Sequence, residues 1–370
     1  MSVLYNFVQP ISVKDTYSAF NQVDFQVQLK QNSIQKNTFR LVGKLKVTKN
    51  GGVALEPTDY VFLNAFAGVS SFISAVSTSV NTSQTIESIA AFPRHCAMRK
   101  QAKYTLADLT ASSLASVELL GSKNNRLLLG EVAEDGYVTF ALKIDNCLNN
   151  MLAGDMHPSV VQEVRLMLTL ESALNALYVN GVSPVLSLDY LMKDLELHYS
   201  EVPAGKVEPI AFETHYLTQQ SIVNKITSLS VLTGSSPADK ISCSFIKQGN
   251  RSNLRKDEFL SEYVSDIKRV EFDVNSSAVS SLYPIESYSD MALNYYRSFV
   301  EPNAPMKKNS ITSMVTYSTC AFGLGVALQE ATNERVSINI TFADQTKEIE
   351  DDPSLYPIDA FVFMNSFIEL

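Results

Sequence analysis

The chain repeats one order of sequence patterns, and this repeat constrains its fold more than any other feature. Residues 72–80 read as a strand, followed by a polar turn, the tripeptide Ile86-Glu87-Ser88 and a helix-like stretch. Residues 266–274 begin the same series, which contains Ile285-Glu286-Ser287 in the same place. A tripeptide recurs easily by chance, but a matching order of elements indicates a duplicated fold.

The two halves of the chain also end alike. Apolar residues alternate with other residues at 164–170 and again at 336–342, which is the two-residue period of a half-buried strand. Each segment is followed by a connection and then by a last strand, at about residues 191–199 and 360–368. Because four features recur in one order, we predict two copies of one fold with loops of different length. Coincidence among β-rich segments is the alternative.

A linker between the copies should follow the last strand of the first one. Residues 201–206 contain Pro203 and Gly205 and show no periodicity, which is typical of a linker. The 370 residues are enough for two domains that each bury a core. We therefore predict a first domain at residues 1–202, with a short N-terminal arm, and a second at residues 203–370.

Strand patterns dominate the rest of the chain. Apolar residues alternate at 25–29, 39–47 and 138–142, and the turn Asn50-Gly51-Gly52 predicts a hairpin. Helical patterns are fewer: residues 90–109, residues 289–300, and residues 172–179 with Ser172 as N-cap. Many strands with long connections favour a sandwich or jelly roll over a meander.

Charge excludes one large class of function. The chain has 30 Lys and Arg against 39 Asp and Glu, a net charge of −9. Proteins that neutralise phosphate gather cations on one face, and the densest basic stretches here, residues 94–103 and 251–256, are short. We predict no direct sequence-specific binding of nucleic acid and no direct role in packaging a genome. Only 19% of the residues are charged, which favours a subunit that buries much of its surface.

Two uncharged windows, residues 60–86 and 309–329, exceed the length of a membrane span. Ser, Thr, Asn and Gly interrupt both windows, so we predict buried strands there. The N-terminus has no basic start and no signal-peptide core, and the first charged side chain is Lys14. We expect loops 234–239 and 249–256 to be exposed.

The four cysteines lie far apart in the sequence, and no CxxC pair suggests zinc or a redox switch. We expect four reduced, mostly buried thiols, typical of a protein assembled in a reducing compartment. They are Cys96, Cys147, Cys243 and Cys320.

No pattern predicts catalysis or a cofactor. Glu213 and His215 could place two metal ligands on one face of a strand, but no third ligand lies at useful spacing, so we expect a surface or interface pair. His95 and Cys96 are adjacent, and neighbouring side chains diverge, which disfavours a Cys-His nucleophile. We expect no enzyme activity, since Walker loops and nucleophile elbows are also absent. The weak candidates for a metal site are Glu348, Glu350, Asp351 and Asp352, which we read as a solvated acidic loop.

One passage resembles a known family. It runs Glu163-Val-Arg-Leu-Met-Leu-Thr-Leu-Glu-Ser-Ala-Leu-Asn-Ala-Leu and continues, after a connection, with Tyr190-Leu-Met-Lys-Asp-Leu-Glu-Leu-His-Tyr-Ser-Glu-Val-Pro. This succession of strand, short helix and final strand is similar to the end of the first barrel in double jelly-roll major capsid proteins of tailless icosahedral DNA viruses, the lineage that includes adenovirus hexon. The resemblance implies an all-β fold with short helices, built as two tandem eight-stranded jelly-roll barrels.

The resemblance also implies a role. Three subunits would form a pseudo-hexagonal homotrimer, and such trimers would tile an icosahedral shell in the virion after assembly in the host cell interior. The implied partners are the chain itself, other capsid proteins such as the penton, and the internal membrane that underlies the shell in many relatives. The alternatives are a minor capsid subunit and a carbohydrate-binding or adhesin-type β-sandwich. The absence of Trp, a common stacking platform for sugars, counts against the carbohydrate-binding alternative.

Overall fold

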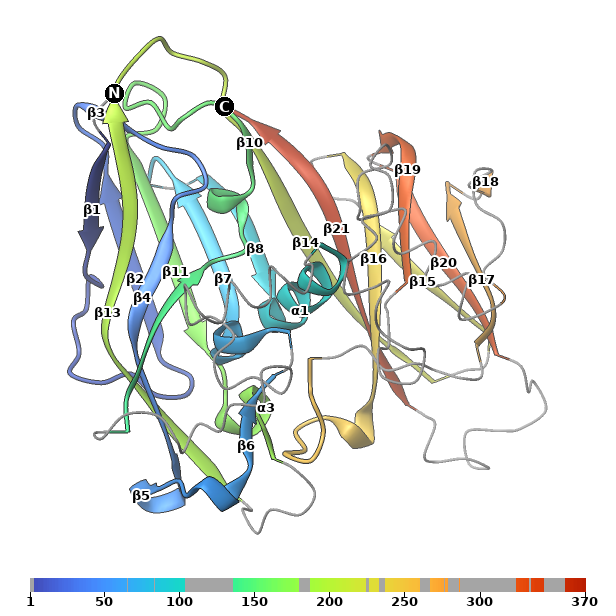
Figure 1. Cartoon of the computed structure of the whole chain (residues 1–370). Coiled ribbons are helices and arrows are strands. Elements are labelled where there is room, and N and C mark those ends of the chain that lie inside the picture. The colour runs from blue at the N-terminus through green and yellow to red at the C-terminus, as the bar shows by residue number, and fades with distance from the viewer. Residues whose placement is uncertain are drawn as a thin grey trace.

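The first half of the chain forms an eight-stranded barrel, which we call barrel 1 (Figure 1). Its sheet A has the order β1-β13-β4-β9, and its sheet B has the order β2-β11-β7-β8. The strands are β1 Leu4–Val8, β2 Gln22–Gln28, β4 Arg40–Lys49, β7 Ile73–Val80, β8 Gln84–Ala90, β9 Val138–Lys143, β11 Glu163–Leu170 and β13 Leu188–Pro203. The computed structural model describes residues 3–64, 66–82, 84–103, 136–179, 187–223, 226–232, 237–259, 267–275, 277–278, 286, 324–332, 334–342 and 357–370.

The second half forms barrel 2 in the same way. Its sheet C has the order β14-β21-β16-β19, and its sheet D has the order β15-β20-β17-β18. The strands are β14 Ala211–Ile222, β15 Ile226–Leu232, β16 Ala238–Lys247, β17 Ile267–Val274, β18 Ser277–Ala278, β19 Leu324–Thr332, β20 Arg335–Phe342 and β21 Ile358–Glu369.

The two barrels match strand for strand. When the eight strands of each barrel are taken in chain order, sheet A corresponds to sheet C and sheet B to sheet D, with every pairing preserved. In each barrel the first strand pairs with the last, and the third pairs with both the last and the sixth. Two four-stranded sheets with this order are a jelly roll. The predicted duplication and the predicted pair of eight-stranded jelly rolls are confirmed.

Short elements fill the connections of the first half. The hairpin predicted at Asn50-Gly51-Gly52 joins β4 to β5, and Gly51 and Gly52 both have positive φ, which glycine adopts without strain. The short elements are β3 Asn32–Ile34, η1 Asn50–Gly52, β5 Val53–Ala54, η2 Pro57–Asp59, β6 Val61–Leu63, η3 Gly68–Phe72, α1 Phe92–Lys103, η5 Cys147–Asn149, β10 Met151–Ala153, α3 Ala173–Ala176 and β12 Leu177–Val179, with η6 Gln248–Asn250 in the second half.

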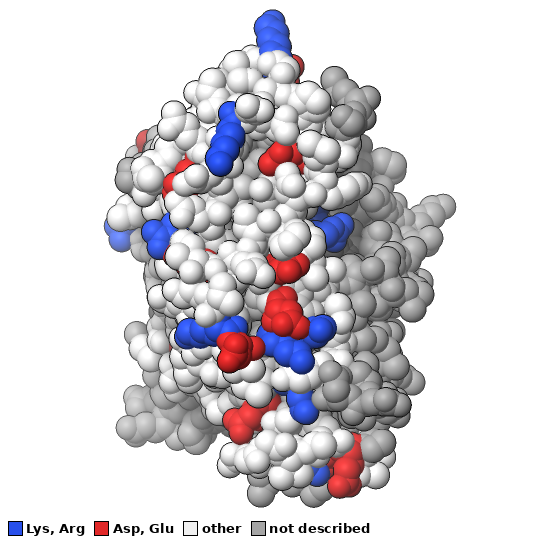
Figure 2. Space-filling model, turned by 90° about the vertical axis from the view of Figure 1, so that its left-hand side faces the viewer, with Lys and Arg blue, Asp and Glu red and all other residues white. Residues whose placement is uncertain are grey.

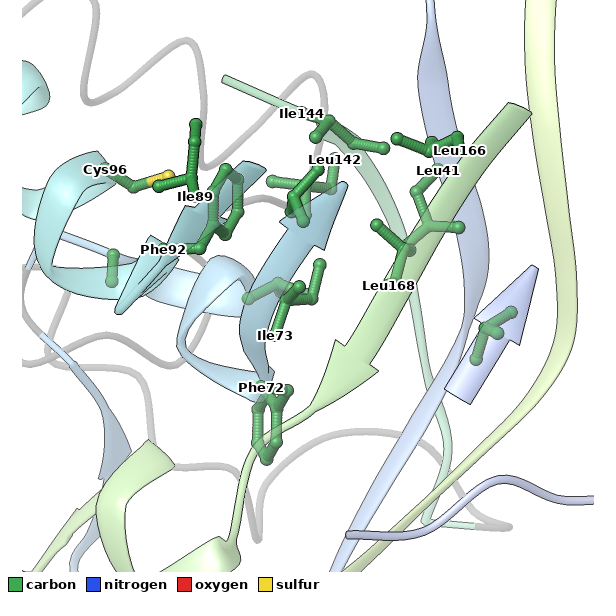
Figure 3. Close-up of a cluster of buried hydrophobic side chains, with 14 of the residues drawn as sticks. Leu41, Phe72, Ile73, Ile89, Phe92, Cys96, Leu142, Ile144, Leu166 and Leu168 are labelled. Atoms are coloured by element: carbon green, nitrogen blue, oxygen red, sulfur yellow. The ribbon is translucent and has the colours of Figure 1, made fainter. Parts of the chain in front are cut away.

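Alternating side chains give barrel 1 its core. In β11, Leu166 and Leu168 are fully buried, while Arg165 on the opposite face is exposed. Figure 3 shows side chains from both sheets meeting between them, with Leu41 from sheet A and Leu166 from sheet B, and with Phe92 of α1 nearby. The strands predicted from periodicity at 25–29, 39–47, 138–142, 164–170 and 336–342 are confirmed.

Sheet C has a core on both of its faces, whereas sheet A does not. In β21, Ala360 and Val362 belong to the core of barrel 2, and the intervening Phe361 and Phe363 belong to the core of barrel 1. In sheet A only the inner face packs in a core, and Figure 2 shows the molecule from the side on which its outer face lies. The strand β10, from the first half, pairs with β14 and extends sheet C.

Several local predictions need correction. The predicted helix at 172–179 has Ser172 as N-cap, with its Oγ accepting from the Asn175 amide at 3.3 Å, but only α3 is helical. Residues 177–179 form β12 instead, because Leu177 and Val179 become buried on pairing with β6. In the stretch predicted as a helix at 90–109, Ala90 still belongs to β8 and the helix α1 begins at Phe92.

The linker and two loops also differ from expectation. The predicted linker at 201–206 begins inside β13, which runs to Pro203 because residues 201–203 pair with β3. Two residues in the loops expected to be exposed are buried. Ala238 lies at the start of β16, and the Leu254 carbonyl accepts a hydrogen bond from the Val179 amide at 2.7 Å. The predicted helix at 289–300 and residues 104–109 lie outside the described residues.

In the first uncharged window, residues 61–64 and 66–80 are mostly buried in β6, η3 and β7, as predicted, whereas Tyr60 and residues 81–82 and 84–85 are exposed. Most of the second window lies outside the described residues. Cys96, Cys147 and Cys243 are buried thiols outside any disulfide, as expected, and Cys320 is not among the described residues. In the part of the chain that the structure describes, no helix is both long and apolar enough to cross a membrane.

The close packing of Gly154 against the connection between the barrels can be tested by substitution. Gly154 has φ +70°, and a Cβ on it would lie 2.6 Å from the Pro209 carbonyl oxygen, whereas Gly51 has φ +79° and open space around it. Gly51→Ala should cost only the backbone penalty of about 1–2 kcal/mol. Gly154→Ala should lower the urea midpoint of unfolding clearly more, because the backbone of residue 209 must also move. Equal midpoints for the two variants would contradict this close packing.

Candidate functional site, a buried polar junction between the barrels

The helix α1 and the strand β8 of barrel 1 lie against sheet C of barrel 2 (Figure 1). Residues 92–100 of α1 are all buried, so the helix has no solvated polar face in this stretch, and its charged side chains need partners inside the protein. We call these groups and their partners the junction. Its members are Glu87, Arg94, His95, Arg99, Asp145, Glu213, His215, Ser244 and Glu258.

Arg94 ties α1 to barrel 2 by three kinds of contact. Its Nη1 donates to Ser244 Oγ at 3.0 Å, and its Nη2 donates to the Glu258 carbonyl and lies 3.8 Å from Glu258 Oε1. Its guanidinium stands over the ring of Phe361, 4.5 Å from the centroid. A planar cation can satisfy acceptors at its edge and an aromatic ring at its face at once, so this side chain is well suited to full burial.

Arg99 bridges the halves one turn further along the helix. Its Nε lies 3.1 Å from Asp145 Oδ2 of barrel 1, and its Nη1 lies 3.3 Å from Glu213 Oε1 on β14. Its Nη2 donates to Asn150 Oδ1 at 3.2 Å, and Nη1 also contacts His215 Nε2. Burial by itself lowers the pKa of Arg99, but the carboxylates of Asp145 and Glu213 raise it above its ordinary value. The guanidinium therefore stays charged.

Glu87 on β8 receives donors from both halves. Its Oε2 accepts from the Cys147 amide at 2.6 Å, and its Oε1 accepts from the His215 amide at 2.9 Å. His215 Nδ1 lies 3.0 Å from the same oxygen. Burial raises the pKa of Glu87 to about 8, although the Cys147 and His215 donors act in the opposite direction. The carboxyl is thus a titratable group between the barrels.

Ring contacts close the junction. The rings of His95 and His215 have centroids 4.3 Å apart, and His95 also contacts Phe363 at 5.4 Å. Burial raises the pKa of the Cys147 thiol well above its ordinary value, so this thiol is a poor nucleophile. The arrangement can hold two barrels in one orientation, because its hydrogen bonds are lost if the barrels shift.

The junction brings together residues that are far apart in the sequence. Glu213 and His215, expected as a surface or interface pair, lie on one face of β14 in the interface between the barrels, with 3.9 Å between Glu213 Oε1 and His215 Nε2. Among the described residues, no group of His, Cys, Asp and Glu has the arrangement of a metal site. The weak candidates Glu348, Glu350, Asp351 and Asp352 lie outside the described residues.

Sequence reasoning missed the role of the basic stretch at 94–103. Its short length argues only against a phosphate-binding surface, whereas the structure shows that Arg94, Arg99 and Lys100 are buried. A signal was present: uncharged or apolar residues, Phe92 and Cys96 among them, share the predicted helix with the cations. The remaining histidines, His157 and His198, lie outside the junction, near Ser159 and Glu196 respectively.

Comparison with known proteins agrees with this architecture. No family model matches the sequence, and no curated protein matches it. Similar solved structures are the Faustovirus major capsid protein (TM-score 0.61, 8% identity, 100% of this chain and 90% of that chain), a chain of the Sputnik virophage (0.60, 10%, 100% and 86%) and the mavirus major capsid protein (0.54, 11%, 99% and 90%). The chain is a double jelly roll.

In this double jelly roll the junction lies where the two barrels meet. The similar structures cover both barrels together, so the side-by-side arrangement, and not only the single barrel, is shared with them. Because only 8–11% of the residues are identical, what these proteins share is the arrangement of the sheets and not the side chains that hold it. The junction is this chain's own set of contacts for holding that geometry.

Arg99 offers a test of how strongly the junction holds the barrels. In Arg99→Met the carboxylates of Asp145 and Glu213 keep their buried positions without this cation, which should destabilise the fold by about 3–5 kcal/mol. The measurement is urea unfolding followed by circular dichroism. Arg165→Met is the matched control, because the Arg165–Asp24 pair lies on an exposed strand face, and its midpoint should move far less. Equal shifts in the two variants would contradict the assignment.

Glu87 predicts a pH dependence with a definite sign. Its pKa of about 8 in the folded protein exceeds the ordinary value of 4.5, so between these values the folded state binds more protons than the unfolded state. Stability from this group is therefore full below about pH 4.5 and is lost as the pH rises toward 8. In Glu87→Gln the thermal midpoint should fall less steeply between pH 5 and pH 8 than in the wild type.

The control for this measurement is Glu208→Gln, which changes an exposed carboxyl. Its pH profile should overlay the wild-type profile. If Glu87→Gln also overlays the wild type, Glu87 does not carry the proton that distinguishes the folded state.

Proposed function

We propose that this double jelly roll is a major capsid protein, the subunit that forms pseudo-hexagonal trimers in an icosahedral virus shell. The observation that supports the proposal best is the similarity of both barrels, taken together, to the major capsid proteins of Faustovirus and mavirus. The residues described at the junction support a structural task, because they join barrels and leave no nucleophile poised for chemistry. We propose no enzyme activity.

The duplicated barrel explains how one chain can fill a hexagonal tile. Three copies related by a threefold axis present six similar barrels, and six similar barrels approximate sixfold symmetry. Neighbouring tiles on a flat facet then meet through similar contacts on every side. Interfaces that hold a permanent assembly bury about 2,000 Å² or more, which an extended barrel wall can supply.

The proposal places the protein in the virion capsid after assembly inside the host cell. Its partners there are further copies of the chain, other capsid proteins such as the penton and, where the virus has one, the internal membrane beneath the shell. Direct sequence-specific binding of nucleic acid is not part of the proposal. The burial of Arg94, Arg99 and Lys100 supports this, because buried cations cannot neutralise phosphates on a genome.

The test is the native mass of the purified protein by light scattering over a range of concentrations. A stable species of three times 40.9 kDa is the expected result, and electron microscopy of the concentrated sample should then show hexagonal tiles. A monomer at all concentrations would contradict the major-capsid proposal. Addition of salt distinguishes specific trimers from charge-driven clusters, because only the clusters should disperse.

A further inference from the structure

Strand β8 of barrel 1 is joined to β14 of barrel 2 through one buried carboxyl group, that of Glu87 (Figure 1). Its Oε1 accepts from the His215 amide at 2.9 Å and lies 3.0 Å from His215 Nδ1. Its Oε2 accepts from the Cys147 amide at 2.6 Å. The side chain of Glu87 is fully buried, so a change in its charge acts on these contacts without screening by water.

The directions of the hydrogen bonds define the form of the His215 ring. The Arg99 guanidinium carries only donors, so its contact with His215 Nε2 requires this nitrogen to be the acceptor. The neutral ring then has its hydrogen on Nδ1 and donates it to Glu87 Oε1. A second hydrogen on the ring would point an N–H group at the Arg99 guanidinium. The geometry therefore favours a neutral ring, which brings no positive charge to Glu87.

The charges near Glu87 favour a neutral carboxyl. The Arg99 guanidinium lies 3.1 Å from Asp145 Oδ2 and 3.3 Å from Glu213 Oε1, so two carboxylates already surround this cation. An ionised Glu87 would add a third carboxylate to the same buried cluster. Burial raises the pKa of Glu87 to about 8, and the nearby Asp145 acts in the same direction.

The hydrogen of the neutral carboxyl has a defined place. Because Oε1 already receives two N–H groups from His215, this hydrogen belongs on Oε2. From Oε2 it reaches the side chain of Cys147, to which the carboxyl is hydrogen-bonded. The neutral carboxyl thus keeps its three N–H contacts and makes one further bond within barrel 1.

We propose that the Glu87 carboxyl is a proton-operated latch between the two barrels. The neutral carboxyl keeps β8 closed against β14, and release of its proton opens this contact while both barrels stay folded. Opening admits water, which solvates the carboxylate and removes the cost of burying its charge. The latch lies within one chain, so this inference goes beyond the proposed function and does not depend on it.

The opening is confined to the junction, because the core of barrel 2 is a separate cluster and Phe361 and Phe363 keep the barrels attached. Thr78, opposite Glu87 on β7, brings no charge to the site. The titratable or charged groups that face Glu87 or its partner His215 come from three neighbouring segments. They are Asp145 and Cys147 at η5, Glu213 and His215 on β14, and His95 and Arg99 on α1.

Proton linkage gives the latch a direction with pH. The carboxyl has a pKa of about 8 in the closed junction, and its ordinary value of 4.5 applies when it is open to water. Between these values the closed state holds the proton and the open state does not. Opening therefore becomes up to about tenfold more favourable for each pH unit as the pH rises. Above about pH 8 both states are ionised, and the dependence ends.

Hydrogen exchange, measured residue by residue, reports the latch directly. The amides of Cys147 and His215 donate to Glu87, so they lose protection when the contact opens. After correction for the intrinsic exchange rate, their protection should fall by up to about tenfold per pH unit from pH 5.5 to pH 7.5. The amides of Leu166 on β11 and Ile338 on β20, inner strands of the two barrels, should keep their protection.

Glu87→Gln is the matched variant. Its amide oxygen can accept from His215, but the side chain does not ionise, so protection of the His215 amide should be independent of pH. The histidines remain in this variant, and any pH dependence left in it belongs to them. Glu208→Gln, at an exposed carboxyl, is the control and should reproduce the wild-type profile. If Glu87→Gln does not fold, the wild-type comparison of junction and inner-strand amides still decides.

The outcomes separate local opening from other effects of pH. A flat wild-type profile at Cys147 and His215 would overturn the latch. Equal loss of protection at Leu166 and Ile338 would show that the whole fold loosens, which would also overturn it. Loss confined to the junction and absent from Glu87→Gln would support the latch. The native mass of the protein does not enter these results, so the capsid proposal is tested separately.

Discussion

Strand β21 packs in two hydrophobic cores at once, and the rest of the molecule depends on this. Ala360 and Val362 fill barrel 2, and Phe361 and Phe363 reach into barrel 1. Alternation of side chains across a strand usually separates a core from water. Here it separates one core from another, so sheet C cannot leave barrel 1 without exposing aromatic rings. The two barrels are therefore held as one unit by burial of apolar surface.

The polar junction restricts the orientation in which the two barrels make that apolar contact. Hydrophobic burial has little angular preference, whereas the bonds of Arg94 to Ser244 and of Arg99 to Glu213 and Asn150 fit only one placement of α1 on sheet C. Burial of such charges costs desolvation energy, and the ion pairs offset part of it. The polar contacts thereby restrict the angle between the two barrels.

Duplication gives the two barrels corresponding sheets, and these sheets are covered differently. Within the chain one sheet of this kind is used and its counterpart, sheet A, is left with Tyr5 and Phe7 exposed. Sheet A and sheet C therefore have the same strand order but different surroundings.

The strands with alternating apolar residues, the repeat and the fold class could be predicted from the sequence. Alternating apolar residues such as Val164, Leu166 and Leu168 predict a strand, because the alternation reflects only which face of the strand is buried. Such a pattern can be read from neighbouring residues. The position of the basic stretch and of the Glu213–His215 pair between the barrels is visible only in the tertiary structure. Arg99 meets Glu213 across 114 residues, and no spacing in the sequence encodes such a distance. Residues 177–179 became a strand rather than a helix for the same reason, since β6 supplied a partner from far along the chain.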